Sequence, residues 1–386
     1  MSSQQKSLTV LVTGDFCPQK TVESLSMEGR FDAIYGDILA QLRDKDLSIT
    51  NLECPLTLAS AASEKIGPSL RAHPVCAQAV RFGGFGVATL ANNHIMDYGV
   101  QGLRDTIQNL SGAGVKSVGA GVDLMAASAV LYVDCNGSSV AIVNMAESEF
   151  GMASEGCPGA SPMDPVTAHY RMREARKEAE SVLVFLHGGA EQHPYPTPRM
   201  LRFARYMADL GASAVFVHHS HCLAGYESWN GVPIFHGLGD FLFEWPELGS
   251  VPRESVFIRL TLSGGRARTA KILPFYHRAG ETLIRAMDES TKQKLLARIE
   301  QLGEPLRNPH VLAARTQSLV ERRTPDTLAA LLLLGRFGKT LLSAGALDRM
   351  LQKRRSRILL LMNLIRCETH RDVVLEVLQR LLDSRR

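Results

Sequence analysis

The sequence predicts an α/β fold that is followed by an all-helical C-terminal extension. Three observations lead to this prediction. Hydrophobic residues make up 45% of the 386 residues, which is enough for a large core. Short apolar runs alternate with helix-type patterns through the first 280 residues, and only helix-type patterns follow. The net charge changes sign, from −4 over residues 1–280 to +8 over residues 281–386, so we expect two units with the boundaries 8–280 and 281–386.

The first unit begins with a strand and then alternates between strands and helices. Short apolar runs predict strands over Leu8–Val12, Leu47–Asn51, Val87–Leu90, Val115–Val118, Val140–Asn144, Val182–Leu186, Ala214–Val217, Ile234–Phe235 and Val256–Leu262. Apolar residues three and four apart predict helices over Phe31–Arg43, Val100–Ala113, Asp164–Glu180 and Pro198–Leu210. Strands separated by helices of this length favour parallel pairing.

The second unit reads as helices only. The pattern predicts helices over Leu283–Gln301, Pro309–Arg323, Asp326–Ser343, Ala346–Cys367 and Arg371–Arg386, divided at Gly303–Pro305, Thr324-Pro325 and Gly345. Its apolar stripes exceed what one short bundle needs, so we expect packing on the sheet domain or a homo-oligomer. The basic run Lys353–Arg357 is typical of a solvated helix face. The alternative is that it faces an acidic polymer or nucleic acid, and of these two partners we do not expect nucleic acid.

The cysteines and the N-terminal residues indicate the cellular compartment in which the protein is expected. The seven cysteines are scattered without CxxC pairing, and this odd number does not suggest a disulfide framework. Residues 1–14 contain neither a signal sequence nor a membrane span, and no later apolar stretch approaches the roughly 20 residues that a span requires. We therefore expect a cytoplasmic protein that does not cross a membrane.

Polar residues of the kind that bind metals recur where predicted strands end. They lie in Thr13-Gly14-Asp15, Asn51-Leu52-Glu53, Asn92-Asn93-His94 with Asp97, His187–Glu191 and His218–His221. Sheets of α/β proteins place their sites at this edge. Carboxylates, an amide carbonyl and imidazoles together are the donor set of divalent transition metals. The sequence thus predicts a metal site, although a single Asp or His at a strand end is more often a cap.

These residues resemble a known family. Gly14-Asp15, Asn51–Glu53, the Ala-Asn-Asn-His-x-x-Asp-x-Gly segment over 91–99, His187–Glu191, His219–His221 and Pro233–Phe241 are similar to the CapA family, named for poly-γ-glutamate capsule synthesis. That family shares the fold of the calcineurin-like metallophosphoesterases. The resemblance covers roughly residues 8–280 and implies a four-layer α/β/β/α sandwich with metals at one edge of its sheets. Residues 281–386 match nothing in it.

The resemblance also implies roles for single residues and two divalent transition metals, Mn, Zn or Fe. By motif correspondence, Asp15 and His221 hold the first metal, Glu53 bridges, and Asn93, His187 and His219 hold the second. His94, with Asp97 one helical turn on, contacts a phosphate or protonates a leaving oxygen. Such a pair of metals activates water for hydrolysis.

Other positions carry open alternatives. Cys17 stands where the wider phosphoesterase family has a histidine, and it is either a thiolate ligand or a buried core residue. Asp240 is expected to orient a ligating histidine, and Glu191 to lie near the metals or to bind one. Arg71 precedes the Asn-Asn-His motif and is expected to contact an anionic substrate. His218 is expected to point away from the metals, because side chains alternate along extended backbone.

Three functions follow as alternatives. The first is a metal-dependent hydrolase of a phosphoester, or of an amide or ester in an anionic polymer. The second is a non-catalytic factor for poly-γ-glutamate or a related capsule, which binds its ligand through the same site. The third is a scaffold that acts through its helical segment, or a protein that associates with nucleic acid through that segment.

Overall fold

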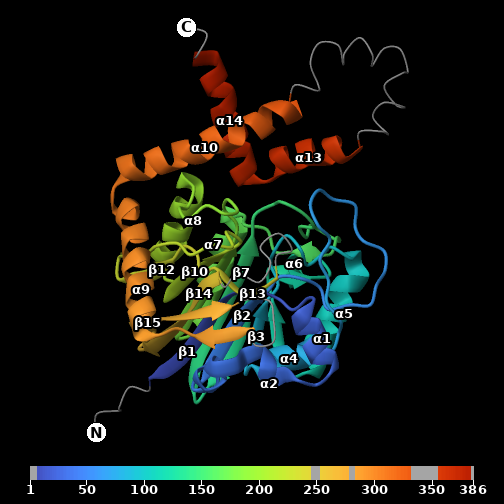
Figure 1. Cartoon of the computed structure of the whole chain (residues 1–386), viewed down its shortest axis with the longest axis vertical. Coiled ribbons are helices and arrows are strands. Elements are labelled where there is room, and N and C mark those ends of the chain that lie inside the picture. The colour runs from blue at the N-terminus through green and yellow to red at the C-terminus, as the bar shows by residue number, and fades with distance from the viewer. Residues whose placement is uncertain (1–6, 245–252, 278–282, 332–354, 384–386) are drawn as a thin grey trace.

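The computed structural model describes residues 7–244, 253–277, 283–331 and 355–383 (Figure 1). Within these ranges two β-sheets face each other, and helices cover the outer face of each sheet. The layers follow the order helix, sheet, sheet, helix. The predicted α/β/β/α sandwich is confirmed, and all nine predicted strands are present.

The first sheet has eight strands and mixes parallel with antiparallel pairs. Its parallel part consists of β1 (Leu8–Cys17), β2 (Leu47–Leu52), β3 (Val87–Thr89), β4 (Lys116–Val118) and β13 (Asp240–Phe243). Its antiparallel part consists of β14 (Arg253–Ser263), β15 (Arg266–His277) and β16 (Ile284–Ala286). β1 lies at the centre, between β2 and β14, and the end of β13 joins it.

The second sheet has six strands. They run in the order β11 (Tyr226–Trp229), β12 (Val232–Phe235), β10 (Ala214–His218), β9 (Ser181–His187), β7 (Ser138–Ala146) and β6 (Leu131–Cys135). The four inner strands are parallel, and both edge strands are antiparallel. A separate pair, β5 (Ala120–Gly121) and β8 (Gly159–Ala160), links the loops beside the two sheets.

Alternation along the strands builds three cores. In β1, Val10 and Val12 face the opposite sheet, whereas Leu11 faces the helices on the outer side. In β7, Ile142 joins the core between the sheets and Val143 joins the core under the outer helices. Successive side chains of a strand point to opposite faces, so strands that are buried on both faces need apolar residues throughout.

Helices cover the outer face of each sheet. The first sheet is covered by α1 (Thr21–Met27), α2 (Phe31–Tyr35), the 3₁₀ turn η1 (Gly36–Ile38), α3 (Leu39–Arg43), α4 (Cys76–Phe82) and α5 (Gly99–Gly112). The second is covered by α7 (Pro165–Glu178) and α8 (Pro198–Asp209), and the short α6 (Leu124–Ala127) packs beside β5. The single helix expected over Phe31–Arg43 is divided at Gly36, whose positive φ of 46° ends α2.

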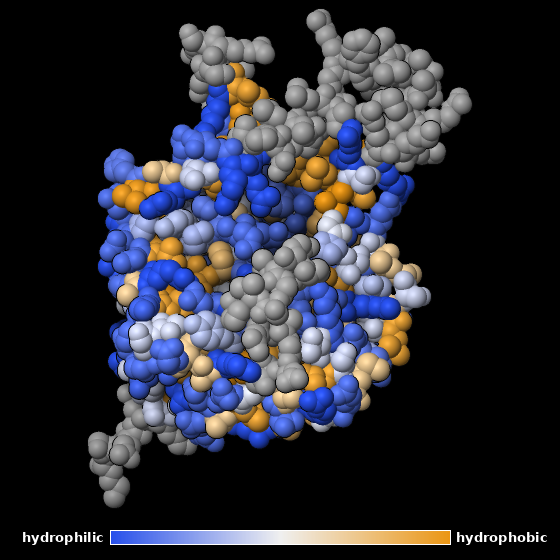
Figure 2. Space-filling view, in the orientation of Figure 1, coloured by the Kyte–Doolittle hydropathy of each residue, from blue (hydrophilic) through white to orange (hydrophobic). Residues whose placement is uncertain are grey.

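The C-terminal helices lie along one side and across one end of the sandwich (Figure 1). They are α9 (Glu289–Gly303), the 3₁₀ turn η3 (Glu304–Arg307), α10 (Pro309–Leu331), α13 (Arg355–Arg366) and α14 (Glu368–Asp383). Hydrophobic side chains are exposed on α13 and α14, among them Ile365 and Leu375. Figure 2 shows hydrophobic surface at this end of the molecule. No helix among the described residues is both long and apolar enough to cross a membrane.

Two expectations for the C-terminal part need correction. The helix predicted over Leu283–Gln301 starts only at Glu289, because residues 284–286 add β16 to the edge of the first sheet. The predicted boundary between residues 280 and 281 thus falls between two paired strands. The predicted break at Thr324-Pro325 is also wrong, since α10 continues to Leu331 and a proline removes only one bond of the helix ladder. Residues 332–343 and 346–354 of the next two predicted helices lie outside the described residues. The rest of the helix predicted over 346–367 is confirmed over residues 355–366.

The first C-terminal helix belongs to the core of the sandwich. Leu295 and Ile299 of α9 are buried in the cluster between the two sheets. α9 also contacts β11, an edge strand of the second sheet, and β15, which pairs with the edge strand β16 of the first sheet. It closes the side of the sandwich on which these strands lie.

We therefore expect Ile299→Ala to lower the free energy of unfolding by about 2–5 kcal/mol, as removal of a buried branched side chain does. Lys294→Ala, at an exposed position of the same helix, serves as the control and should stay within about 0.5 kcal/mol of the wild type. Urea unfolding followed by circular dichroism measures both variants. Equal stability of the two variants would show that α9 is an appendage.

Candidate metal centre

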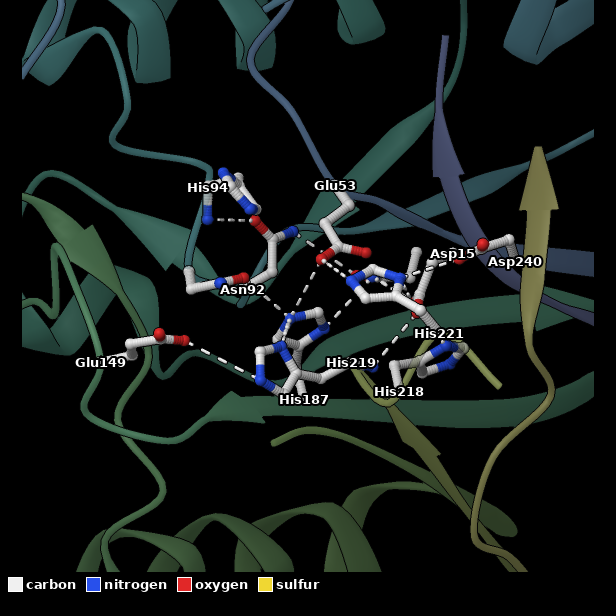
Figure 3. A network of polar contacts seen from close by, with 12 residues as sticks. Asp15, Glu53, Asn92, His94, Glu149, His187, His218, His219, His221 and Asp240 are labelled. Carbon is white, nitrogen blue, oxygen red and sulfur yellow. Dashed lines mark hydrogen bonds and ion pairs between the residues drawn. The ribbon is translucent and has the colours of Figure 1, made fainter. Parts of the chain in front are cut away.

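The carboxyl ends of several parallel strands meet at one edge of the sandwich (Figure 3). Asp15 lies near the end of β1, and Glu53 directly follows β2. His187 ends β9, and His218 ends β10. Both sheets send their parallel strands toward this edge, so polar residues that are far apart in the sequence converge there.

Six of the predicted residues form one buried cluster. Ligand atoms lie within 4.8 Å of one another in each of three overlapping groups: Glu53, His219 and His221; Asp15, His221 and Asp240; and Asp15, Glu53 and His187. Glu53 Oε1 is 3.5 Å from His187 Nε2 and 3.4 Å from His221 Nε2. The structure thus brings carboxylates from the first sheet against imidazoles from the second.

Glu53 is the least satisfied member of this cluster. It has no exposed surface, and neither carboxylate oxygen accepts a hydrogen bond from a described residue. Burial raises the pKa of Glu53 well above its usual range, against the opposing charge of His221. A buried carboxylate without hydrogen bonds costs several kcal/mol unless a cation compensates it. The residues present therefore fit a bound metal ion.

Asp240 contacts the ring nitrogen of His221 that does not face Glu53. Its Nδ1 lies 2.8 Å from Asp240 Oδ1, and Arg253 donates to Asp240 Oδ2 at 2.6 Å and to the His221 carbonyl at 2.9 Å. Burial alone would lower the pKa of His221, but the charges of Glu53 and Asp240 raise it well above its usual range. Asp240 thus orients the imidazole so that Nε2 faces Glu53.

The other half of the cluster surrounds His187. Its Nε2 lies 3.0 Å from Asn93 Oδ1 and 3.2 Å from His219 Nδ1. Burial and the neighbouring His219 lower the pKa of His187, which favours the neutral imidazole that binds metals. On its far side, His219 Nε2 is 3.9 Å from Glu149, a residue that the sequence analysis did not select.

Asp15 is oriented by two further residues, neither of which was predicted to be a metal ligand. Asn51 donates to Asp15 Oδ1 at 2.8 Å, and His218 Nδ1 lies 3.0 Å from the same oxygen. Burial alone would raise the pKa of Asp15, but the His218 hydrogen bond and the charges of His218 and His221 lower it. His218 therefore lies behind the cluster and contacts Asp15 from outside.

The backbone at the cluster adopts uncommon conformations. His219 has a φ of 93° and His221 a φ of 52°, both positive and unfavourable for residues other than glycine. A Cβ at Gly14 would lie 1.9 Å from the Gly239 carbonyl oxygen, so only glycine fits beside Asp15. Such strain persists where the surrounding structure enforces it, and it clusters at functional sites.

His94 lies beside the cluster in a chain of polar contacts. Its Nδ1 is 2.7 Å from Asp97 Oδ2, and Lys65 forms an ion pair with Asp97 and lies 3.1 Å from His94 Nδ1. An Nδ1–H that donates to Asp97 leaves Nε2 as the second ring nitrogen for other contacts. Burial lowers the pKa of His94, and the Lys65 charge adds to this effect.

Other predicted residues have different surroundings. Cys17 is buried in the apolar core under the first sheet, where burial and the neighbouring Cys54 raise the pKa of its thiol. These contacts support the core alternative over the thiolate ligand. Arg71 donates to the Ala59 carbonyl and lies over the Tyr98 ring at 4.9 Å, so its contacts are outside the cluster. Glu191 is exposed and lines a cavity that borders the cluster.

Comparison with known proteins places these residues in a family. Residues 9–245 match the family model of the bacterial capsule synthesis protein PGA_cap. The chain is 30% identical over 300 residues to the PGA biosynthesis protein CapA of Bacillus subtilis, covering 75% of this chain and 77% of that protein. It is 32% identical over 232 residues to a probable polyglutamine synthesis accessory protein of Mycobacterium tuberculosis, covering 56% of this chain and 60% of that protein.

Solved structures give weaker likenesses. A novel phosphatase from Mycoplasma pneumoniae has a TM-score of 0.46 at 12% identity and covers 76% of this chain and 99% of that one. A 5'-nucleotidase from Candida albicans has a TM-score of 0.37 at 12% identity and covers 66% of this chain and 51% of that one. Both TM-scores are below 0.5, so no function follows from them. On the match of its sequence over residues 9–245, the chain belongs to the PGA_cap family of bacterial capsule synthesis proteins.

Proposed function

We propose that the protein is a hydrolase that uses two divalent transition metals bound at the edge of the sandwich. The observation that carries this proposal is the Glu53 carboxylate, which is completely buried, accepts no hydrogen bond from a described residue and faces imidazoles. In the proposal Asp15 and His221 hold one metal, Glu53 bridges, and Asn93, His187 and His219 hold the other.

The donor set supports Mn, Zn or Fe, because it combines carboxylates with several imidazoles and an amide oxygen. When bound, such metals lower the pKa of water and neutralise charge on the attacking and leaving oxygens. The protein's own part is to fix these ligands. Asp240 and Arg253 orient His221, while Asn51 and His218 orient Asp15. The apolar core beneath keeps water away from the carboxylates.

We assign the proton donor to His94. Its Nδ1 is hydrogen-bonded to the Asp97 carboxylate. In the proposal, Nε2 is therefore the atom that protonates a leaving oxygen or donates to a substrate anion. Because burial lowers the pKa of this imidazole, its protonated form is a stronger acid than a free histidine. Lys65 balances the charge of Asp97 and so leaves less of that charge to stabilise the imidazolium.

The proposed substrate is a phosphoester, or an amide or ester within an anionic polymer. The alternative is a non-catalytic capsule factor that binds such a polymer at the same site, and the relatives, which are called biosynthesis and accessory proteins, favour it. The two functions differ in one measurable property, which is turnover by the metal-loaded protein. A cytoplasmic location stays a prediction that rests on the seven unpaired cysteines.

Glu53→Gln tests the metal centre. The variant should lose most of its bound metal, because a neutral amide replaces the carboxylate that faces the imidazoles. A chelator should lower the melting temperature of the wild type, since a bound ligand stabilises the native state, but should leave that of the variant unchanged. Elemental analysis and thermal melts measure both effects.

Glu155→Gln is the matched control, because Glu155 is exposed and lies outside the cluster. It should keep the metal content and the chelator response of the wild type. A Glu53→Gln protein with full metal content would contradict the proposed bridging position.

His94→Ala tests the proton donor. Turnover of bis(p-nitrophenyl) phosphate with Mn²⁺ or Zn²⁺ should fall on the order of 10²-fold or more, the range typical for loss of general acid help, while metal content stays near the wild-type value. His169→Ala, an exposed histidine on α7, should change neither quantity. Loss of metal in His94→Ala would make His94 a ligand, and a metal-loaded wild type without turnover on phosphoesters or poly-γ-glutamate would favour the binding factor.

A further inference from the structure

A cavity of about 290 Å³ borders the candidate metal centre. One side is formed by residues that follow the strands of the second sheet, among them Glu149 and Glu191. A second side is formed by the loop residues 66–68. The remaining walls come from the C-terminal helices α10, α13 and α14, which lie across this end of the sandwich (Figure 1).

Glu149 connects the cavity to the cluster. One of its oxygens lies 3.9 Å from His219 Nε2, and the other accepts a hydrogen bond from Asn363 of α13 at 3.3 Å. On the opposite side, Lys65 precedes the cavity loop and contacts His94 and Asp97. The cavity is therefore lined on one side by Glu149, which contacts His219, and on another by the loop that follows Lys65, which contacts His94.

Buried contacts fix the C-terminal helices over the centre. Thr369, at the start of α14, donates to Glu147 at 2.6 Å, and Glu147 also accepts from the backbone N–H of Gly189. Ser148 donates from its backbone and its hydroxyl to the two oxygens of Glu368, at 3.1 and 3.3 Å. Residues 147–149, directly after β7, thus all contact α13 or α14.

A second set of contacts fixes the loop and α10. Arg355, the first residue of α13, forms an ion pair with Glu64 in the loop that carries Lys65. Arg322 of α10 lies 3.4 Å from His193 Nδ1, in the segment that follows His187. The helices are held at several points around the cavity, so its walls are a built part of the site.

The chemistry of the cavity combines an apolar wall with unused polar atoms. Leu360 and Leu364 supply apolar surface on α13. Asn363 Oδ1 and His370 Nδ1 are buried and have no hydrogen-bond partner among the described residues. Arg323 of α10 lines the same cavity with a permanent positive charge, and no ion pair joins it to another described residue.

We propose that the C-terminal helices provide a second binding point for the substrate, in which Arg323 binds an oxyanion that the substrate carries at a distance from the bond to be cleaved. The apolar wall at Leu360 and Leu364 contacts the chain between the two groups, and the cleaved group lies at the metal centre. An arginine suits this role because its planar guanidinium binds carboxylates and phosphates through two hydrogen bonds.

The carboxylates in the cavity fit this arrangement. Glu149 is directed to His219 and Asn363, and Glu191 is exposed at the side of the cavity nearest the strands. Both follow strands of the second sheet and line the cavity on that side, whereas Arg323 lines it from α10. The inference rests on the proposed function. It narrows the substrate to a molecule whose second anionic group is separated from the cleaved bond by a chain of several atoms, and so excludes simple phosphate monoesters.

The test uses probes that cannot be hydrolysed, titrated calorimetrically into the metal-loaded full chain. Methylphosphonate reports the metal centre alone. Alkylphosphonates with three to six carbons report the apolar wall, and phosphonocarboxylates of the same lengths add the second anion. The wild type should bind the best phosphonocarboxylate at least about 10-fold more tightly than the matching alkylphosphonate. Bisphosphonates of that length then distinguish a carboxylate site from a phosphate site.

Two variants separate the parts of the site. Arg323→Ala should abolish the preference for the second anion and leave alkylphosphonate affinity unchanged. Leu364→Trp should fill the cavity and weaken the longer probes at least about 10-fold while methylphosphonate binding stays the same. Arg357→Ala, an exposed arginine of α13 outside the cavity, and Leu375→Trp on the exposed face of α14 are the controls, and both should behave like the wild type.

The outcomes also separate this inference from the proposed function. A wild type that binds methylphosphonate without preference at any chain length overturns the second binding point and leaves the metal centre intact. An Arg323→Ala protein that still binds phosphonocarboxylates more tightly than alkylphosphonates also overturns the second binding point. A metal-treated wild type that does not bind methylphosphonate at all overturns both proposals.

Discussion

The structure of the site depends on one constraint, which is the burial of the Glu53 carboxylate among imidazoles. The strands that deliver Glu53, His187 and His221 come from two different sheets. Their ends can meet only if the sheets are held face to face by the apolar core between them. Without a cation the same core would make this arrangement costly, because it excludes the water that could solvate the carboxylate. The fold therefore brings the proposed ligands together, and the proposed metals offset the cost of burying the Glu53 carboxylate.

The surroundings of the cluster limit how far its members can move. Asp240 and Arg253 hold His221 on one side, and Asn51 and His218 hold Asp15 on the other. The positive φ angles at His219 and His221 show that the backbone accepts local strain to point these rings inward. A site fixed in this way favours ligand geometry over local stability, as is typical of sites that bind metals or substrates.

The sequence predicted nine of the strands and most of the cluster, because both leave short-range signals. Buried strands such as β7 and β9 are continuous apolar runs, and the ligand-type residues follow directly after them. β15 was missed because its first half is exposed and mixed in composition, and β16 because three residues give no period. The roles of Glu147 and Thr369 could not be predicted, since 222 residues separate them and only the tertiary fold brings them together.

The most direct test of the central claim is a crystal structure of the protein with Mn²⁺ or Zn²⁺, with anomalous scattering recorded at the edge of the metal. The expected result is two peaks about 3.5–4 Å apart, one on each side of the Glu53 carboxylate, with His221 next to one peak and His187 next to the other. A structure without anomalous density at this position, or one in which water or protein donors satisfy both oxygens of Glu53, would contradict it.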